Sequence, residues 1–386
     1  MSKMKDQNAP LVIREVKTKK ERLAFVRFPN ELYRENPYYV PPLFSDELAD
    51  MDEKKNPAFT YAKAKYFLAY RGKTVVGRIG AIYNTRANIK WQSTRMRFTQ
   101  VDFVDDKEVS QALFSAVEDF AKERGCHEIH GPLGFCDLDR EGMLVDGFEE
   151  KGLFYTYYNA PYYKEHLEAL GYVKDVDWIE INVDHAKTEP RTREMLEKLS
   201  LRALKRHNLH IVDIRRKSDF RPYIEKAFAL VNIAYHDLYG VVTLDEVQIR
   251  RYAKKFVPMI DPSLACLVEN EAGELIAFGA TVRSLSDAFR KTGGRLFPFG
   301  WIPTLHALSH ASEVNLLLIA VHPDYQGAGV NAVIINRLLG NALRMGIYTA
   351  ETGPQLETNG NVIDQWKAFP HRRHKRRRCY IKKISE

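Results

Sequence analysis

The chain of 386 residues is long enough for two domains, and a composition of 45% hydrophobic and 28% charged residues fits only a packed globular protein. Lysine and arginine exceed aspartate and glutamate by 58 to 50, and the net charge of +8 favours phosphate-bearing partners: nucleic acid, anionic lipid or a phosphorylated cofactor. The four cysteines lack metal-ligand or redox spacing, which indicates isolated thiols in a reducing compartment. Residues 1–16 lack a signal-peptide pattern and no apolar run approaches 18 residues, so we expect a cytoplasmic protein.

Hydrophobic periodicity divides the first half of the chain into strands and helices. Two apolar runs around Arg71, Gly72 and Lys73 predict a hairpin, and a helical pattern that stops at Gly125 predicts a helix with a glycine C-cap. In chain order we expect a strand at 11–18, a helix at 19–35 broken at Pro29, a proline-rich connector at 36–47, a hairpin at 66–84, a strand at 96–104, a helix at 108–125 and a strand at 127–133.

The second half repeats this order of elements. We expect a helix at 190–208, a strand at 209–215, a helix at 220–240, a hairpin at 264–284, a buried strand at 314–322, a helix ending at Gly346 and a strand at 347–352.

The repeated order predicts an internal duplication. The hairpin segments 68–81 and 267–280 also match each other locally. Two copies of one unit predict an α/β fold with an α+β mixed sheet in two tandem domains, at 1–186 and 187–386.

The two copies differ in one loop. The first passes from strand to helix through DDKEV, whereas the second uses the longer HPDYQGAGVN, which contains Gly327 and Gly329. A glycine loop at a helix N-terminus exposes unpaired backbone N–H groups and lets an anion approach them, although a glycine turn that merely caps the helix has the same pattern. The loop lacks the Gly-Lys-Ser/Thr of a Walker P-loop, and Ala332 stands where a dinucleotide motif has its last glycine.

The segment NLLLIAVHPDYQGAGVN resembles the CoA-binding strand and pyrophosphate loop of the GNAT (Gcn5-related N-acetyltransferase) superfamily. The family pattern Gln/Arg-x-x-Gly-x-Gly/Ala matches at Gln326 and Gly329 and departs at Asn331. The resemblance implies an acyl-CoA N-acyltransferase fold, with coenzyme A bound by the second half only. It implies that Ile319 and Val321 line the pantetheine arm. It also implies a nest for the pyrophosphate made by Gln326, Gly327, Ala328, Gly329, Val330 and Asn331.

Acyl transfer from a thioester to an amine needs a base and donors for the oxyanion. The resemblance places the base early on the central strand, where Asn315 stands and Glu313 lies two residues earlier on the same face. A strand-entry glutamate exposed to solvent is the alternative role for Glu313. Backbone N–H groups near Ala320 are candidate oxyanion donors.

The acid of the family is often a tyrosine in Asn-x-x-Ala-x-x-x-Tyr, which 359–366 resembles with Val362 and Trp366 as departures. Tryptophan cannot protonate a leaving thiolate in the same way. The substitutes that the sequence offers are Tyr348, Glu351 and Tyr380, and each of them can equally be structural.

Two segments leave their roles open. The run HRRHKRRR at 371–378 can be a solvated basic edge, a site for the CoA 3′-phosphate, a contact with an anionic membrane or a nucleic-acid patch. The long insertion 285–312, with LFPFGWIP at its centre, can pack on the first domain or form an apolar lid or membrane contact. His306 with His310 and His371 with His374 lack a third ligand, so no metal is expected.

The whole chain resembles bacterial GNAT-like proteins, some of which resemble ceramide synthases that acylate a sphingoid amine. The resulting hypothesis is an acyl-CoA-dependent N-acyltransferase with an unidentified amine acceptor. Peripheral contact with an anionic membrane is one option of this hypothesis, and a nucleic-acid partner is not expected. The alternatives are a Fem-type transferase using aminoacyl-tRNA, which the basic run favours, and a non-catalytic CoA-binding protein of GNAT fold. RNase sensitivity and turnover of acyl-CoA distinguish the three.

Overall fold

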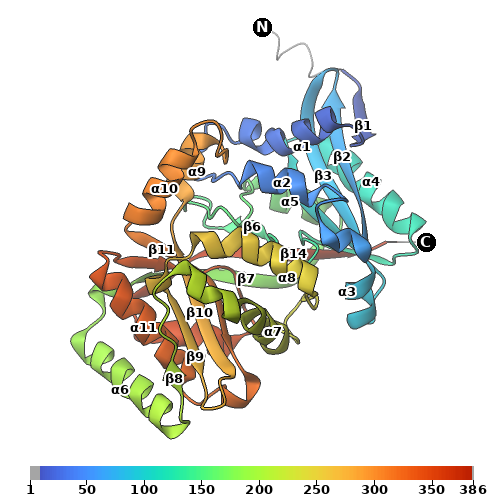
Figure 1. Ribbon diagram of the computed structural model, residues 1–386. Coiled ribbons are helices and arrows are strands. Elements are labelled where there is room, and N and C mark those ends of the chain that lie inside the picture. The colour runs from blue at the N-terminus through green and yellow to red at the C-terminus, as the bar shows by residue number, and fades with distance from the viewer. Residues whose placement is uncertain (1–8, 385–386) are drawn as a thin grey trace. The chain divides into compact units, whose positions relative to one another are not determined.

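The computed structural model describes residues 9–384, which divide into two compact units (Figure 1). Within the described residues, unit 1 comprises residues up to 178 together with 286–302 and 375–384, and unit 2 comprises 179–285 and 303–374. No helix in this part of the chain is long and apolar enough to cross a bilayer.

Unit 1 contains a mixed sheet in the order β1-β2-β3-β4-β5-β14. Neighbouring strands are antiparallel except for the parallel pair β4 and β5. Its elements are β1 (Leu11–Glu15), α1 (Lys19–Leu32), α2 (Phe44–Asp50), β2 (Ala62–Arg71), β3 (Thr74–Asn84), α3 (Thr85–Lys90), β4 (Arg95–Phe103), α4 (Lys107–Glu123), β5 (Glu128–Gly131), β6 (Met143–Asp146), α5 (Tyr162–Ala169), α9 (Ser286–Thr292) and the C-terminal part of β14 (His371–Lys383).

Unit 2 contains a mixed sheet in the order β8-β9-β10-β11-β12-β7. Here too the neighbours are antiparallel except for one parallel pair, β11 and β12. Its elements are the C-terminal part of β7 (Val173–Asp184), α6 (Pro190–Arg206), β8 (His210–Ile211), α7 (Ile224–Ala234), α8 (Glu246–Phe256), β9 (Ala265–Glu269), β10 (Leu275–Arg283), most of α10 (Trp301–His310), β11 (Glu313–Val321), α11 (Val330–Arg344), β12 (Thr349–Glu351), β13 (Gln355–Leu356) and α12 (Gly360–Asp364).

The two sheets therefore share one pairing pattern, which confirms the tandem α/β architecture expected from the repeated order of elements. The sixth strand of each unit comes from the other half of the sequence. Residues 375–383 of β14 complete unit 1, and residues 179–184 of β7 complete unit 2. The compact units thus contain segments from both halves of the sequence. The boundary at 186/187 stays a prediction about the sequence duplication.

The core of unit 2 lies on both faces of its sheet. Apolar residues of α11 and α6 pack on one face against β9, β10 and β11, and α7 packs on the other face. Gly279 of β10 lies directly under α11, because a Cβ there would come within 2.3 Å of Cγ2 of Ile334. This close contact fixes the position of α11, and with it the loop that precedes the helix.

Several expected elements have different limits. The break at Pro29 was wrong: α1 runs through this residue to Leu32, because Phe25, Val26 and Phe28 are buried on its inner side. The connector 36–47 contains the first turn of α2, and the strand expected at 209–215 has only two residues. Packing against neighbouring elements outweighs local propensity at these places.

Candidate functional site

The parallel strands β11 and β12 of unit 2 are paired at only three positions. Their register joins Glu313 to Thr349, Val314 to Ala350 and Asn315 to Glu351. Beyond this point β11 continues to Val321, whereas the chain after β12 follows β7, to which Thr352 N–H bonds at Ile181 O. The strands therefore separate after Asn315, and we call the opening between them the split.

The backbone of β11 turns some of its polar groups toward the split. His322 N–H donates to Ile276 O, which fixes the alternation of the antiparallel ladder with β10. In this alternation Ala320 bonds to β10, while the N–H and C=O groups of Ile319 and Val321 point to the opposite edge. The side chains of both residues pack in the apolar cluster under α11. They therefore offer backbone groups, not side chains, to a ligand in the split.

Two side chains occupy the carbonyl groups along this edge. The Tyr235 hydroxyl donates to Ile319 O at 2.8 Å, and Gln326 Nε2 donates to Val321 O at 3.2 Å. Gln326 thereby ties the glycine loop to the end of β11. These contacts occupy the carbonyl oxygens of Ile319 and Val321, while the N–H groups of the same two residues stay directed toward the split.

The glycine loop (residues 322–329) ends at the N-terminus of α11. Gly327 and Gly329 have φ of 75° and 82°, a left-handed conformation that favours glycine. Gly329 is the N-cap and provides no side-chain cap. Ala328 N–H donates to Tyr325 O, but within the described residues no partner receives the N–H groups of Gly327, Val330 or Asn331. The loop therefore presents several free donors at the positive end of a helix dipole.

Helix α6 lies next to this loop. A Cβ at Gly329 would lie 3.6 Å from Cβ of Ala203, and the rings of His207 and Tyr325 are 6.0 Å apart. Lys205 and Arg206 occupy the last turn of the same helix and are exposed. Unit 2 thus combines the backbone donors of the loop with exposed cations in the last turn of the neighbouring helix α6.

A group of buried polar residues lies where the split begins. Glu180, Glu351 and His374 each offer a ligand atom within 4.8 Å of the others, and Glu351 Oε1 lies 3.2 Å from His374 Nε2. Asn315, the cross-strand neighbour of Glu351, is 0% exposed, and neither atom of its amide has a hydrogen-bond partner among the described residues. We call these four residues the polar cluster.

The sequence located this cluster only in part. Asn315 was named as a site residue and Glu351 as one candidate acid, but Glu180 went unnoticed. His374 was paired with His371, yet the structure buries His374 in the cluster and leaves His371 exposed on β14. These residues come from β7, β11, β12 and β14, so no sequence spacing joins them. The position of Glu180 between Ile179 and Ile181 in β7 was the available signal.

The other expected catalytic residues lie elsewhere. Glu313 is half-buried at the first position of β11, two residues before the split opens. Trp366 is buried in an apolar cluster of unit 2, and its indole N–H donates to Gln355 Oε1. Tyr348 is exposed, and Tyr380 is buried in the core of unit 1.

Only residues 371–373 of the basic run 371–378 are exposed. Its residues form the first part of β14, in which Lys375 and Arg377 are buried. Arg377 donates to Tyr157 O and Thr156 Oγ1, and Arg376 and Arg378 both pair with Asp177. Most of the charge expected to meet phosphate is therefore used inside unit 1.

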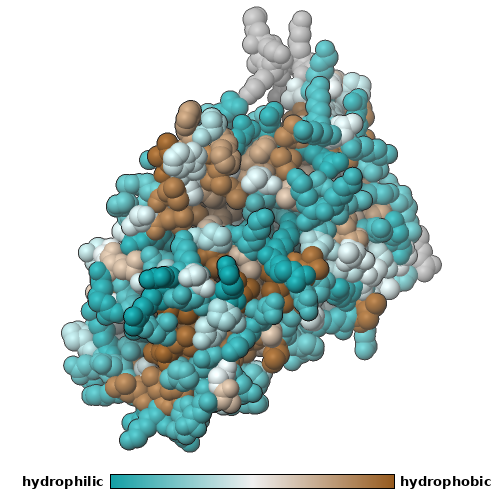
Figure 2. Space-filling view, in the orientation of Figure 1, coloured by the Kyte–Doolittle hydropathy of each residue, from teal (hydrophilic) through white to brown (hydrophobic). Residues whose placement is uncertain are grey.

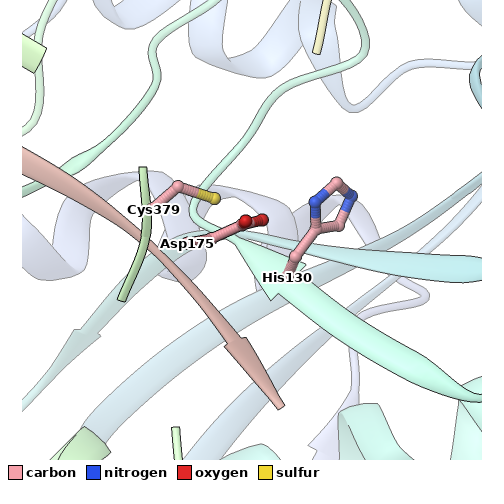
Figure 3. A group of neighbouring side chains, drawn as sticks. All are labelled: His130, Asp175 and Cys379. Carbon is pink, nitrogen blue, oxygen red and sulfur yellow. The ribbon is translucent and has the colours of Figure 1, made fainter. Parts of the chain in front are cut away.

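A second group of potential metal ligands lies in unit 1. Figure 3 shows the Asp175 carboxylate between the thiol of Cys379 and the imidazole of His130. Burial, and then the nearby Arg97 and Arg95, hold the pKa of His130 well below its usual 6.5. Because the same guanidinium groups repel a cation, the surroundings oppose metal binding here.

The insertion 285–312 forms two helices with different environments. α9 packs within unit 1, where Phe289 contacts the ring of Phe154. The following segment instead exposes apolar side chains, which appear brown over α10 in Figure 2. These residues, named here the apolar segment 297–305, are Phe297 (80% exposed), Phe299 (71%), Trp301 (45%), Ile302 (51%) and Leu305 (55%).

Comparison of the sequence and the structure with known proteins indicates which fold the chain has. No family model matches the chain. It is 26% identical to "Protein YghO" of Escherichia coli over 386 residues, covering 97% of this chain and 95% of that protein. It is 28% identical to the "Bacterial ceramide synthase" of Caulobacter vibrioides over 330 residues, covering 83% and 82%. A solved "Tandem GNAT protein from the clavulanic acid biosynthesis pathway" matches with a TM-score of 0.56, 12% identity and coverage of 98% and 100%. The chain therefore has the tandem GNAT fold.

Proposed function

From the tandem GNAT fold, we propose that this protein is an acyl-CoA-dependent N-acyltransferase whose CoA thioester binds in unit 2. The observation that carries the proposal is the joining of two features in one unit: a split with outward-facing backbone donors on β11, and a glycine loop with free N–H groups at its end. A pantetheine arm needs backbone partners along a strand, and a pyrophosphate needs donors at a helix N-terminus.

Each part of coenzyme A has a corresponding part of the site. The pyrophosphate meets the loop from Gln326 to Asn331, and the pantetheine arm pairs with the backbone N–H of Val321. Lys205 and Arg206 of α6 are the nearby cations for the remaining phosphate charge. The Ile319 N–H, beside Ala320, is the proposed donor to the oxyanion that forms when an amine attacks the thioester.

The proposed acceptor is an amphipathic primary amine of sphingoid type. The relative from Caulobacter vibrioides is named for ceramide synthesis, and acylation of such an amine uses a substrate that partitions into membranes. A soluble primary amine would serve the same chemistry, so the acceptor is tested directly.

The apolar segment 297–305 supports contact of the protein with an anionic membrane. Five exposed large apolar side chains follow closely after Arg290, Lys291 and Arg295, a combination that binds the interface of anionic bilayers. We expect co-sedimentation with vesicles of phosphatidylcholine and phosphatidylglycerol, and its loss in a Phe297→Ser/Phe299→Ser variant. Ile89→Ser, which removes an equally exposed apolar side chain from α3, is the matched control.

The function is tested by mixing the purified protein with long-chain acyl-CoA and a panel of long-chain and soluble amines. The expected result is amine-dependent release of free CoA thiol together with formation of the amide. Binding of CoA without thiol release would favour a non-catalytic CoA-binding protein. Transfer that disappears after RNase treatment would favour a tRNA-dependent transferase, and absence of CoA binding would overturn the proposal.

A further inference from the structure

The polar cluster of unit 2 has a property that packing does not explain. Asn315 is fully buried, and its amide oxygen and nitrogen both lack partners among the described residues. Buried amides are almost always hydrogen-bonded, because leaving them unpaired costs free energy. An unpaired amide beside two buried carboxylates and an imidazole indicates a place that a polar ligand or water fills.

The cluster lies on one face of the sheet, at the closed end of the split. Asn315 and Glu351 are cross-strand partners, so their side chains project from the same face. Glu351 is also paired with Asn182, and Glu180, two residues away on β7, shares that face. The bulge that shifts the register between Ala280 and Thr281 leaves β11 free to diverge directly after the cluster.

The distance along β11 suits a proton relay. Asn315 and Ile319 are four positions apart on β11, a distance of roughly 13 Å along the strand. The N–H group of Ile319 points into the split. The proposed relay needs one or two bridging waters between an amine nitrogen at the thioester and the cluster.

We infer that Glu351 is the general base that removes the proton from the acceptor ammonium group, with His374 and Asn315 as positioning residues. The inference rests on the proposed function. Through a bridging water, the Glu351 carboxylate accepts one proton from the ammonium. The neutral nitrogen then attacks the thioester carbonyl carbon. The C–N bond forms, the C–S bond breaks and CoA leaves as thiolate, while the second proton lost by the nitrogen neutralises the thiolate by way of water.

Glu351 suits this role better than the two residues expected from the sequence. The amide of Asn315 is not a base, although its unpaired oxygen and nitrogen can hold the bridging water. Glu313 has a carboxylate, but it pairs with Thr349, two positions further from the opening of the split. His374 Nε2 lies 3.2 Å from Glu351 Oε1, which is close enough to position the carboxylate.

The test compares two nucleophiles at neutral pH with the full-length protein and long-chain acyl-CoA. A long-chain primary alkylamine is protonated there and needs the base, whereas hydroxylamine is largely unprotonated. Glu351→Gln keeps the shape of the side chain. It is expected to slow transfer to the alkylamine by roughly 10²- to 10⁴-fold and transfer to hydroxylamine far less, with unchanged CoA binding by calorimetry.

Two further variants separate chemistry from structure. Asn315→Asp combined with Glu351→Gln moves the carboxylate across the strand pair at constant net charge, and is expected to recover part of the alkylamine activity. Glu269→Gln removes another buried carboxylate of unit 2, which pairs with Lys226 and His210 away from the split, and should leave the ratio of the two activities unchanged.

The outcomes distinguish this inference from the proposed function. Wild-type protein that releases no thiol with either nucleophile overturns both. Active wild type with an unchanged ratio in Glu351→Gln, or a selective loss in Glu313→Gln instead, overturns only the role of Glu351. Loss of activity with a chelator and recovery with a divalent cation would also overturn it, because the cluster would then hold a metal.

Discussion

Replacing Gly327 by glutamate tests the glycine loop most directly. A Cβ at this position meets no atom within 4 Å, so the new side chain extends into open space in front of the loop. The left-handed φ of 75° costs a non-glycine residue about 1–2 kcal/mol. If two pyrophosphate charges lie about 6 Å from the new carboxylate, at an effective dielectric constant of about 40, their repulsion totals about 3 kcal/mol. The dissociation constant of CoA should therefore rise about 100-fold.

Gly273 supplies the matched control for this prediction. It lies in unit 2, has φ of 74° and likewise has no atom within 4 Å of an added Cβ, but it belongs to the turn between β9 and β10. Gly273→Glu should lower thermal stability as much as Gly327→Glu while CoA affinity, measured by calorimetry at one ionic strength, stays at the wild-type value. Equal affinity in the two variants would refute the placement of the pyrophosphate.

Three further predictions concern stability, measured by thermal unfolding. Burial holds the pKa of His185 below 6.5, against the opposing effect of its hydrogen bond to Ile347 O, so the unfolded chain binds the proton more readily than the folded one. The free energy of unfolding should therefore be constant above pH 6.5 and fall below it by up to about 1.4 kcal/mol per pH unit, and His185→Gln should reduce this slope. Gly279→Ala should lower the free energy of unfolding by about 1–3 kcal/mol, because the added Cβ meets Ile334. The double variant with Ile334→Ala should lose less stability than the sum of the two single variants, and additive losses would contradict the contact. Arg377→Met should cost about 1–3 kcal/mol by leaving Tyr157 O unpaired, whereas exposed Arg373→Met should change stability by less than about 0.5 kcal/mol; equal effects would contradict a structural role for the buried part of the run.

The sequence predicted the repeated part of the fold well. The hairpins β2–β3 and β9–β10, the strand β11 and the helices α4 and α11 lie close to their expected limits, because each has a long periodic pattern. The exchange of β7 and β14 between the two sheets was not predictable. Strand pairing depends on contacts between residues far apart in sequence, which periodicity does not record.

The basic run shows why composition misleads. HRRHKRRR has the charge of a phosphate-binding patch, but alternation along β14 turns Arg377 inward, while Arg376 and Arg378 pair with Asp177. Each of these guanidinium groups has a partner far away in the sequence. A run of like charges therefore does not establish a surface patch until its partners are known.

By itself the sequence determined the tandem architecture and the glycine loop, since both depend on local patterns: period, turn residues and the spacing of Gln326, Gly327 and Gly329. Only the tertiary structure decided which residues surround the split. Glu180, Asn315, Glu351 and His374 stand on four strands and meet because the sheet aligns them on one face. Local interactions fix a loop from its own residues, whereas a buried cluster exists only after the strands that contribute to it have paired.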